Sequence, residues 1–333
     1  MRKFRSSFIH YLNGVLNPNS FHGIGKQGPF FEGWYYKLIN LKGGQRWTII
    51  PGVYIGAKPE DSHSFIQVMN GINGSTYYIN FPYNQFVANE KEFHVSIGKN
   101  EFSARQVHLA IENDELSLCG DLTFNNLAPW PVAWLSPGIM GWYAWVPSME
   151  CYHGVVSLDH EIIGNLKISN LKTNFSGGRG YIEKDWGKAM PKAWIWLQCN
   201  HFNQPLTSLT ASVAVIPLGA LSFNGFIVGL FLDGILHKFA TYTGARIDRL
   251  SVKEGEVTLI FSDRKKKLEI NARRIEGGLL KAPTLTQMDR RISETLSSEI
   301  DVVLSVRQGG IWQKAFEDSG RYGGLEVVGN LEN

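Results

Sequence analysis

Apolar and polar residues alternate along most of this chain, which is the pattern of strands with one buried and one solvated face. The alternation is clear over residues 93–97 and again over residues 300–306. Asn73 and Gly74 form a typical hairpin turn between two apolar runs. The pattern predicts an antiparallel meander over residues 47–125 and another in the second half of the chain.

The two halves open with similar segments. Residues 31–34 read Phe-Glu-Gly-Trp, residues 182–186 read Ile-Glu-Lys-Asp-Trp, and each is followed by a tryptophan-rich strand. Each meander is long enough for a closed barrel of about eight strands. We therefore predict an all-β fold of two tandem antiparallel β-barrels, with the first domain at residues 1–170 and the second at residues 171–333.

Residues 128–153 interrupt the alternation with four tryptophans and four prolines. So many prolines are incompatible with a regular strand or helix. Because a long apolar loop is usually functional, we expect this segment to cap the mouth of a pocket and to cover the core. A further interpretation is peripheral contact with a membrane surface through residues 130–147.

The composition is that of a globular protein and does not indicate a nucleic-acid partner. The apolar fraction of 44% and the charged fraction of 19% are globular values. A net charge of +3 is too small to indicate a nucleic-acid partner. The three cysteines form no CxxC motif, so we expect reduced thiols and a cytoplasmic protein.

The beginning of the chain and its hydropathy add two expectations. Phe4 and Phe8 begin a roughly helical spacing within residues 1–20, which predicts a short helix. The basic start is interrupted by polar residues and is not typical of a signal peptide. An apolar run of 18 residues is also lacking, so no transmembrane helix is predicted.

Many of the candidate catalytic and binding residues lie within residues 180–202. Because side chains alternate in an extended chain, Tyr181, Glu183 and Asp185 should share one face, and Lys184 should point to the other. An ionisable pair beside aromatic rings is typical of a pocket where an acid meets an apolar ligand, although a solvated Glu-Lys-Asp tip is the alternative. The next strand presents an aromatic and amide face made up of Trp194, Trp196, Gln198 and Asn200.

Other ionisable residues are more ambiguous. Glu32 stands among aromatic residues, where it is either a salt-bridged structural group or part of a site. His153, Asp159 and His160 follow the tryptophan-rich segment, but their spacing matches no known metal motif, so no metal is predicted.

Five segments, taken together and in order, resemble the tocopherol cyclase family, which is related in outline to carotenoid hydratases and lipocalin-like pericyclases. The resemblance runs over nearly the whole chain and implies two lipocalin-like barrels. The segments are Phe30-Phe-Glu-Gly-Trp-Tyr-Tyr36, Met149-Glu-Cys-Tyr-His-Gly154, Tyr181-Ile-Glu-Lys-Asp-Trp-Gly187, Trp194-Ile-Trp-Leu-Gln-Cys-Asn200 and Gly324-Leu-Glu-Val327.

The resemblance implies an acid-initiated cyclisation. Such an enzyme protonates an alkene on the prenyl tail of a quinol, and the phenol oxygen captures the cation, with no cofactor or metal. By position, Glu183 and Asp185 match the family's acidic motif, and we expect Glu183 to be the donor, with Asp185 as its partner and Glu32 in reserve. Members of the family often have an asparagine at the position of Asp185. The resemblance therefore leaves open which carboxyl donates the proton. The residues expected to bind the substrate are Trp34, Tyr36, Glu150, His153, Tyr181, Trp186, Trp194, Trp196, Gln198 and Asn200.

Two other functions remain open from the sequence. A lipocalin-like protein could carry an apolar prenyl or terpenoid ligand without transforming it. A hydratase could add water to an isoprenoid alkene. The paired carboxyls Glu183 and Asp185 favour an enzyme, because a carrier needs no acid in its pocket.

Overall fold

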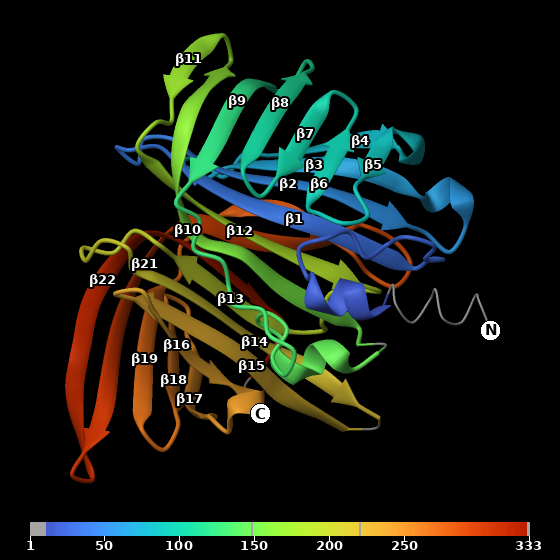
Figure 1. Ribbon diagram of the computed structural model, residues 1–333. Helices are drawn as coiled ribbons and strands as arrows, with labels where there is room; N and C mark the ends of the chain where they lie inside the picture. The colour runs from blue at the N-terminus through green and yellow to red at the C-terminus, as the bar shows by residue number, and fades with distance from the viewer. Residues whose placement is uncertain (1–10, 148, 220, 332–333) are drawn as a thin grey trace. The chain divides into compact units, whose positions relative to one another are not determined.

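The computed structural model describes residues 11–147, 149–219 and 221–331, and it is almost entirely β (Figure 1). Its strands form two sheets, and neighbouring strands along each sheet run antiparallel, as the pairs β1–β2 and β13–β14 illustrate. The expected all-β class is therefore confirmed. The chain divides into two compact units, one around each sheet.

The first unit contains residues 76–190, the chain before residue 71 and the segment 281–291. Its strands follow the spatial order β4-β3-β2-β1-β12-β10-β9-β8-β7-β6-β5, with β11 paired to β10. The bounds are β1 Phe30–Ile39, β2 Arg46–Ile55, β3 His63–Asn70, β4 Thr76–Pro82, β5 Phe86–Ala88, β6 His94–Ile97, β7 Asn100–Ser103, β8 Gln106–Glu112, β9 Ser117–Asn125, β10 Cys151–Ile168, β11 Leu171–Asn174 and β12 Gly178–Gly187.

The second unit has the spatial order β16-β15-β14-β13-β22-β21-β19-β18-β17, with β20 paired to β21. Its strands are β13 Trp194–Cys199, β14 Ser208–Leu218, β15 Leu221–Leu232, β16 Ile235–Ala240, β17 Arg246–Val252, β18 Glu256–Ser262, β19 Lys266–Arg273, β20 Gly278–Ala282, β21 Arg290–Gln308 and β22 Ile311–Val328. The described part of the chain also contains four 3₁₀ turns: η1 Pro59–Asp61, η2 Tyr83–Gln85, η3 Gly141–Trp145 and η4 Thr241–Thr243.

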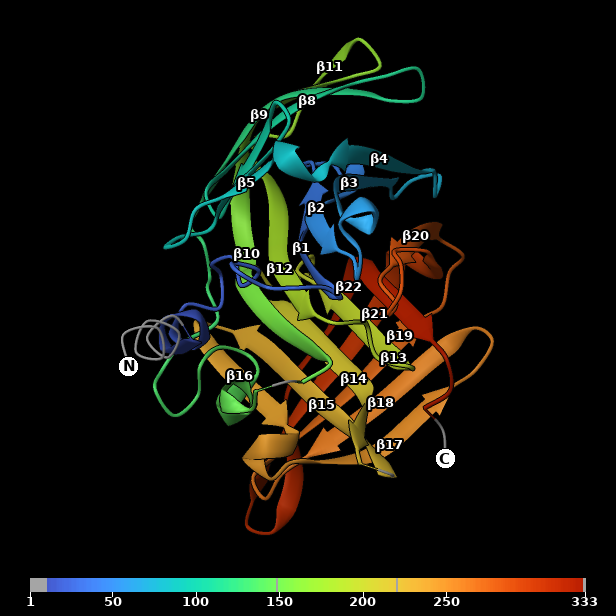
Figure 2. The same cartoon turned by 90° about the vertical axis from the view of Figure 1, so that its right-hand side faces the viewer.

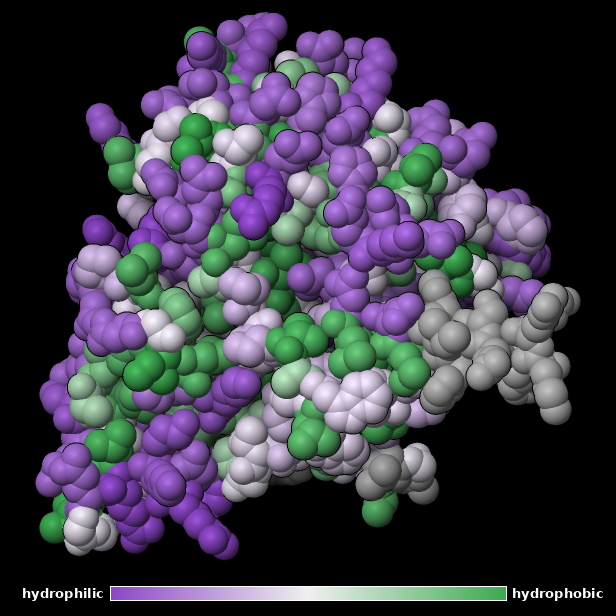
Figure 3. All heavy atoms as spheres, viewed as in Figure 1, coloured by the Kyte–Doolittle hydropathy of each residue, from purple (hydrophilic) through white to green (hydrophobic). Residues whose placement is uncertain are grey.

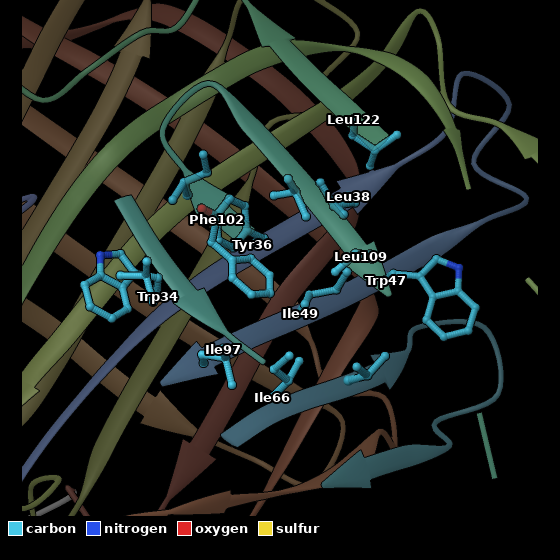
Figure 4. Packing of buried hydrophobic residues seen from close by; sticks show 14 of the residues in the cluster. Trp34, Tyr36, Leu38, Trp47, Ile49, Ile66, Ile97, Phe102, Leu109 and Leu122 are labelled. Carbon is cyan, nitrogen blue, oxygen red and sulfur yellow. The ribbon is translucent and has the colours of Figure 1, made fainter. Parts of the chain in front are cut away.

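The first sheet curls around its own apolar core (Figure 4). Ile66 of β3 and Ile97 of β6 belong to the same buried cluster although these strands lie near opposite ends of the sheet. Trp34 stacks on Phe93 with ring centroids 5.2 Å apart inside this cluster. The curl explains the alternation in the sequence, because one face of every strand must point into the core.

Strand β12 lies in the middle of the first sheet. It pairs with β1 on one side and β10 on the other, and Figure 2 shows the three strands side by side. Residues 182–186 therefore lie in the first sheet, directly opposite residues 32–36, and do not open the second meander as expected. The second sheet begins at β13, so the division between units falls at residue 190 and not at residue 170.

The N-terminal and connecting segments are partly as expected. Residues 11–16 are helical, and the expected residues Phe4 and Phe8 lie outside the described part of the chain. Residues 128–147 contain the 3₁₀ turn η3 but are otherwise irregular. The alternating residues 300–306 lie, as expected, in a strand, which is the long β21 that begins at Arg290. Among the described residues, no helix has the length and hydropathy to cross a bilayer.

A test of this packing is the substitution Gly180→Ala. A Cβ at Gly180 would come within 2.2 Å of Nε2 of His160, whose side chain is buried. Overpacking of this kind typically costs about 1–3 kcal/mol, so the unfolding midpoint in urea should fall. Gly44→Ala is the control, because nothing lies within 4 Å of a Cβ there. Equal midpoints for the two variants would contradict the packing of β10 against β12.

Candidate active site

Four side chains form two hydrogen-bonded pairs, joined by an ion-pair contact, on the face of β12 that points away from the first core. The Tyr181 hydroxyl donates to Oε2 of Glu183 at 2.5 Å. His153 on β10 donates from Nδ1 to Oδ1 of Asp185 at 2.8 Å, and its Nε2 lies 3.5 Å from Oε2 of Glu183. We call Tyr181, Glu183, Asp185 and His153 the proton cluster. The register that places His153 opposite Asp185 brings it together.

The electrostatics of the proton cluster favour a charged histidine. Burial alone would lower the pKa of His153, but the neighbouring carboxylates of Asp185 and Glu183 outweigh it and raise the pKa to about 9. The His153 side chain is only 12% exposed, so water screens this attraction little. At neutral pH, His153 therefore carries a proton between two carboxylates.

The opposite face of β12 carries a different buried group. Lys184 forms an ion pair with Glu32 of β1, and both side chains are fully buried. Nζ of Lys184 also donates to the backbone oxygen of Ser20 at 2.6 Å. Burial alone would raise the pKa of Glu32, but Lys184 and His22 outweigh it and hold this carboxyl ionised. The expectation that Lys184 points away from Glu183 and Asp185 is met.

A stack of three rings lies beside this ion pair. His22 is stacked on Trp186 at 4.3 Å, and Tyr152 lies parallel to Trp186 at 5.4 Å between centroids. Lys184 approaches Trp186, with Nζ 4.7 Å from the ring centroid. Trp186 thus contacts a buried cation as well as two aromatic neighbours.

The same rings line a pocket of about 820 Å³ in the first unit. His153, Tyr152, Trp186 and His22 are in its wall, together with the segment 11–30 and part of the loop before β10. The volume suits a lipid-sized organic ligand. His153 is therefore the member of the proton cluster found among the residues that line the pocket, although its Nε2 is buried beside Glu183.

Three expected binding residues have other positions. Trp34 and Tyr36 are fully buried members of the first core and do not line this pocket. They were expected in the wall because aromatic residues cluster on β1, but the curl of the sheet turns this face inward. The Glu150 carboxyl, whose pKa burial raises, is half-buried, and its backbone oxygen accepts a hydrogen bond from the amide of Lys188.

The remaining expected residues belong to the second unit. Trp194, Trp196 and Gln198 alternate along β13 with Ile195, Leu197 and Cys199, which join the second core. The shared face predicted for these residues agrees with this alternation. Trp194 donates from Nε1 to Oε2 of Glu326 at 2.6 Å. Asn200 follows the strand and is buried.

The sequence did not indicate which side chains would contact the expected site residues. Lys184 was expected only to point away, and His22 and Tyr152 were not singled out. Lys184 and Glu32 are 152 positions apart in sequence, so only the pairing of β1 with β12 brings them together. One available signal was the charge of Lys184 within an otherwise apolar phase that includes Ile182 and Trp186.

The candidate metal residues have separate partners. Asp159 forms an ion pair with Arg179, and burial together with Arg179 lowers the pKa of His160 to about 3. In the proton cluster, the ligand atoms of His153, Glu183 and Asp185 lie within 4.8 Å of one another, which could surround a metal ion. A metal would have to displace the proton of His153, which the two carboxylates stabilise. The donor set therefore fits a proton better.

Comparisons with known proteins agree with the expected family. Residues 122–329 match the family model described as tocopherol cyclase-like. A probable chloroplastic tocopherol cyclase from Oryza sativa subsp. japonica is 23% identical over 325 residues, covering 81% of this chain and 69% of the rice protein.

Two solved structures share the fold. Kievitone hydratase from Nectria haematococca superposes with a TM-score of 0.54 at 12% identity, over 89% of this chain and 88% of its own. CghA superposes with a TM-score of 0.55 at 11% identity, over 92% of this chain and 90% of its own. The expected lipocalin-like class with two antiparallel sheets is thus confirmed.

The charge on His153 can be tested by NMR titration. We expect its pKa near 9 in the folded protein, and Asp185→Asn should lower it because one stabilising carboxylate is lost. The folded pKa lies above the ordinary value of 6.5, so the stabilisation is complete below about pH 6.5 and is lost as pH rises through about 9. Asp121→Asn, which removes the exposed partner of His108, is the control. A His153 pKa near 6.5 would contradict the proton cluster.

The buried ion pair gives a stability test. Lys184→Met leaves the Glu32 carboxylate buried without its cation, which should lower the free energy of unfolding by about 3–5 kcal/mol. Adding Glu32→Gln removes the stranded charge and should restore part of the loss. Lys314→Met breaks an exposed pair with Glu317 and should change stability by less than about 1 kcal/mol. A Lys184→Met effect as small as this control would show that the pair is unimportant.

Proposed function

This chain belongs to the tocopherol cyclase-like family, and from that premise we propose that it is an acid-initiated cyclase of a prenylated quinol or related terpenoid lipid. The observation that supports the proposal most is the protonated His153 in the wall of the 820 Å³ pocket. An alkene needs a proton donor in contact with it, and an apolar tail needs a pocket large enough to exclude water.

The proposed step begins at Nε2 of His153, a buried atom that has to become accessible to the alkene when the ligand binds. The N–H bond breaks as a C–H bond forms at the less substituted alkene carbon, which leaves a tertiary cation. The phenol oxygen attacks this cation, and its proton returns to the neutral His153. The product is an isomer of the substrate and the imidazolium is restored, so no other reactant is consumed.

The two carboxyls have supporting parts in this scheme. Asp185 fixes the orientation of the imidazole through Nδ1, and Glu183 stabilises the charge beside Nε2. Tyr181 holds the Glu183 carboxyl in place. This assignment moves the donor from Glu183, which the sequence favoured, to His153, because His153 is among the residues that line the pocket and Glu183 and Asp185 are not.

The ring stack would stabilise the developing cation. Trp186 and Tyr152 both line the pocket, and aromatic faces attract a cation. The ammonium of Lys184 lies near Trp186 and would oppose this effect if it were uncompensated. The ion pair with Glu32 removes that repulsion, which gives the buried pair a role beyond stability.

Two related functions share the same pocket. A hydratase would deliver water in place of the phenol oxygen, and the water would return its second proton to His153. A carrier would bind the ligand in the 820 Å³ pocket without proton transfer. The products distinguish the three: an isomer, a hydrate or unchanged ligand.

The deciding variant is His153→Gln, which keeps hydrogen bonding but cannot carry the proton. We expect prenyl-quinol binding, followed by tryptophan fluorescence, to persist while turnover falls by about 10²-fold or more. Asp185→Asn should move the alkaline limb of the pH–rate profile to lower pH, since a less stabilised His153 loses its proton earlier. His108→Gln is the matched exposed control. Native turnover by His153→Gln would overturn the assignment, and binding without any product in the native protein would favour the carrier.

A further inference from the structure

The connecting segment before β10 presents an uncharged surface of aromatic and aliphatic residues. Residues 128–147, here called the tryptophan loop, contain four tryptophans and no Asp, Glu, Lys or Arg. Figure 3 shows apolar side chains gathered on this face, beside the N-terminal helix. Its exposed side chains, with their exposed fractions, are Val132 43%, Trp134 60%, Leu135 82%, Trp142 49% and Val146 37%.

The tryptophan loop is held in a defined shape. Trp130 is buried and anchors its beginning, and the amide of Leu158 donates to the Ala128 oxygen at 2.7 Å. Trp145 donates from Nε1 to the backbone oxygen of Trp134 at 2.9 Å, and their rings lie 4.9 Å apart. The exposed side chains therefore stand on a supported surface, which reduces the entropy lost when they are buried by a partner.

The same loop forms part of the pocket wall. Pro137, Met140 and Ala144 line the pocket, while Trp134 and Leu135 point to solvent and do not. An apolar ligand entering from a surface bound to the loop would therefore pass from one apolar environment to another. Such an entry route favours ligand uptake only if the ligand is dissolved in a lipid phase.

The charges around the pocket favour an anionic surface. Lys26, Lys91 and Lys188 line it and are exposed, against a single exposed carboxylate, Glu90. Exposed tryptophans together with lysines are the combination that binds the interface of an anionic bilayer, where indole rings sit at the headgroup level. A protein partner would explain the apolar residues but not the excess of lysines over carboxylates at the pocket.

We propose that the tryptophan loop docks this protein on an anionic lipid bilayer, so that the pocket can take its ligand directly from the membrane. The inference rests on the proposed function for the identity of the ligand but not for the docking itself. Trp134 and Leu135 enter the interface, and the lysines attract the lipid headgroups.

Flotation of the full chain with vesicles tests the docking. Vesicles of phosphatidylcholine with phosphatidylglycerol should bind the protein more tightly than phosphatidylcholine alone, and added salt should weaken the difference. Leu135→Ser and Trp134→Ser should each lower vesicle affinity by about tenfold or more, since each removes a large exposed apolar group. Leu171→Ser, at 73% exposure on the distant β10–β11 hairpin, is the matched control and should bind normally.

Three results would overturn the docking surface: no flotation of the native protein, equal losses for Leu135→Ser and Leu171→Ser, or a dimer in sedimentation that Leu135→Ser dissolves without any vesicle binding. Turnover separates this inference from the proposed function. Leu135→Ser should turn over detergent-dispersed prenyl-quinol normally but vesicle-borne prenyl-quinol slowly. Native turnover without vesicle binding would reject only the docking, and vesicle binding without turnover would reject only the enzyme.

Discussion

The alternation of side chains along β12 is the constraint on which the candidate site depends. A central strand with neighbours on both sides must point successive residues to opposite faces, so Glu183 and Asp185 lie on one face and Lys184 on the other. Without that separation, Lys184 would neutralise the two carboxylates that hold the proton on His153. The cation is instead paired with Glu32 against the core. One strand thus supports two buried charge clusters with different functions.

The sequence allowed the local part of this arrangement to be predicted. Period-two alternation identified the strands and the shared face of Tyr181, Glu183 and Asp185, because both follow from the backbone alone. It could not predict which strand pairs with which. The return of β12 to β1 displaced the expected division between units, and the approach of His153 to Asp185 depends on a β10 register that contains bulges.

Aromatic residues show the same limit. A strand rich in tryptophan and tyrosine can line a ligand pocket or fill a core, and its composition is identical in both cases. Trp34 and Tyr36 fill the first core, whereas Trp186, on the same face of the neighbouring strand, reaches the pocket because it lies near the end of β12. Whether such a residue fills the core or lines the pocket depends on its position along the strand. Only the tertiary structure shows which positions lie next to the pocket.

The central claim is that the protein moves a proton from its own side chain to an alkene carbon, and isotope incorporation tests it most directly. When prenyl-quinol is incubated with the enzyme in D₂O, mass spectrometry should find one deuterium fixed to carbon in each product molecule, since His153 exchanges its proton with solvent before each turnover. A cyclised product that contains no carbon-bound deuterium, or a substrate recovered unchanged after prolonged incubation, would contradict the account.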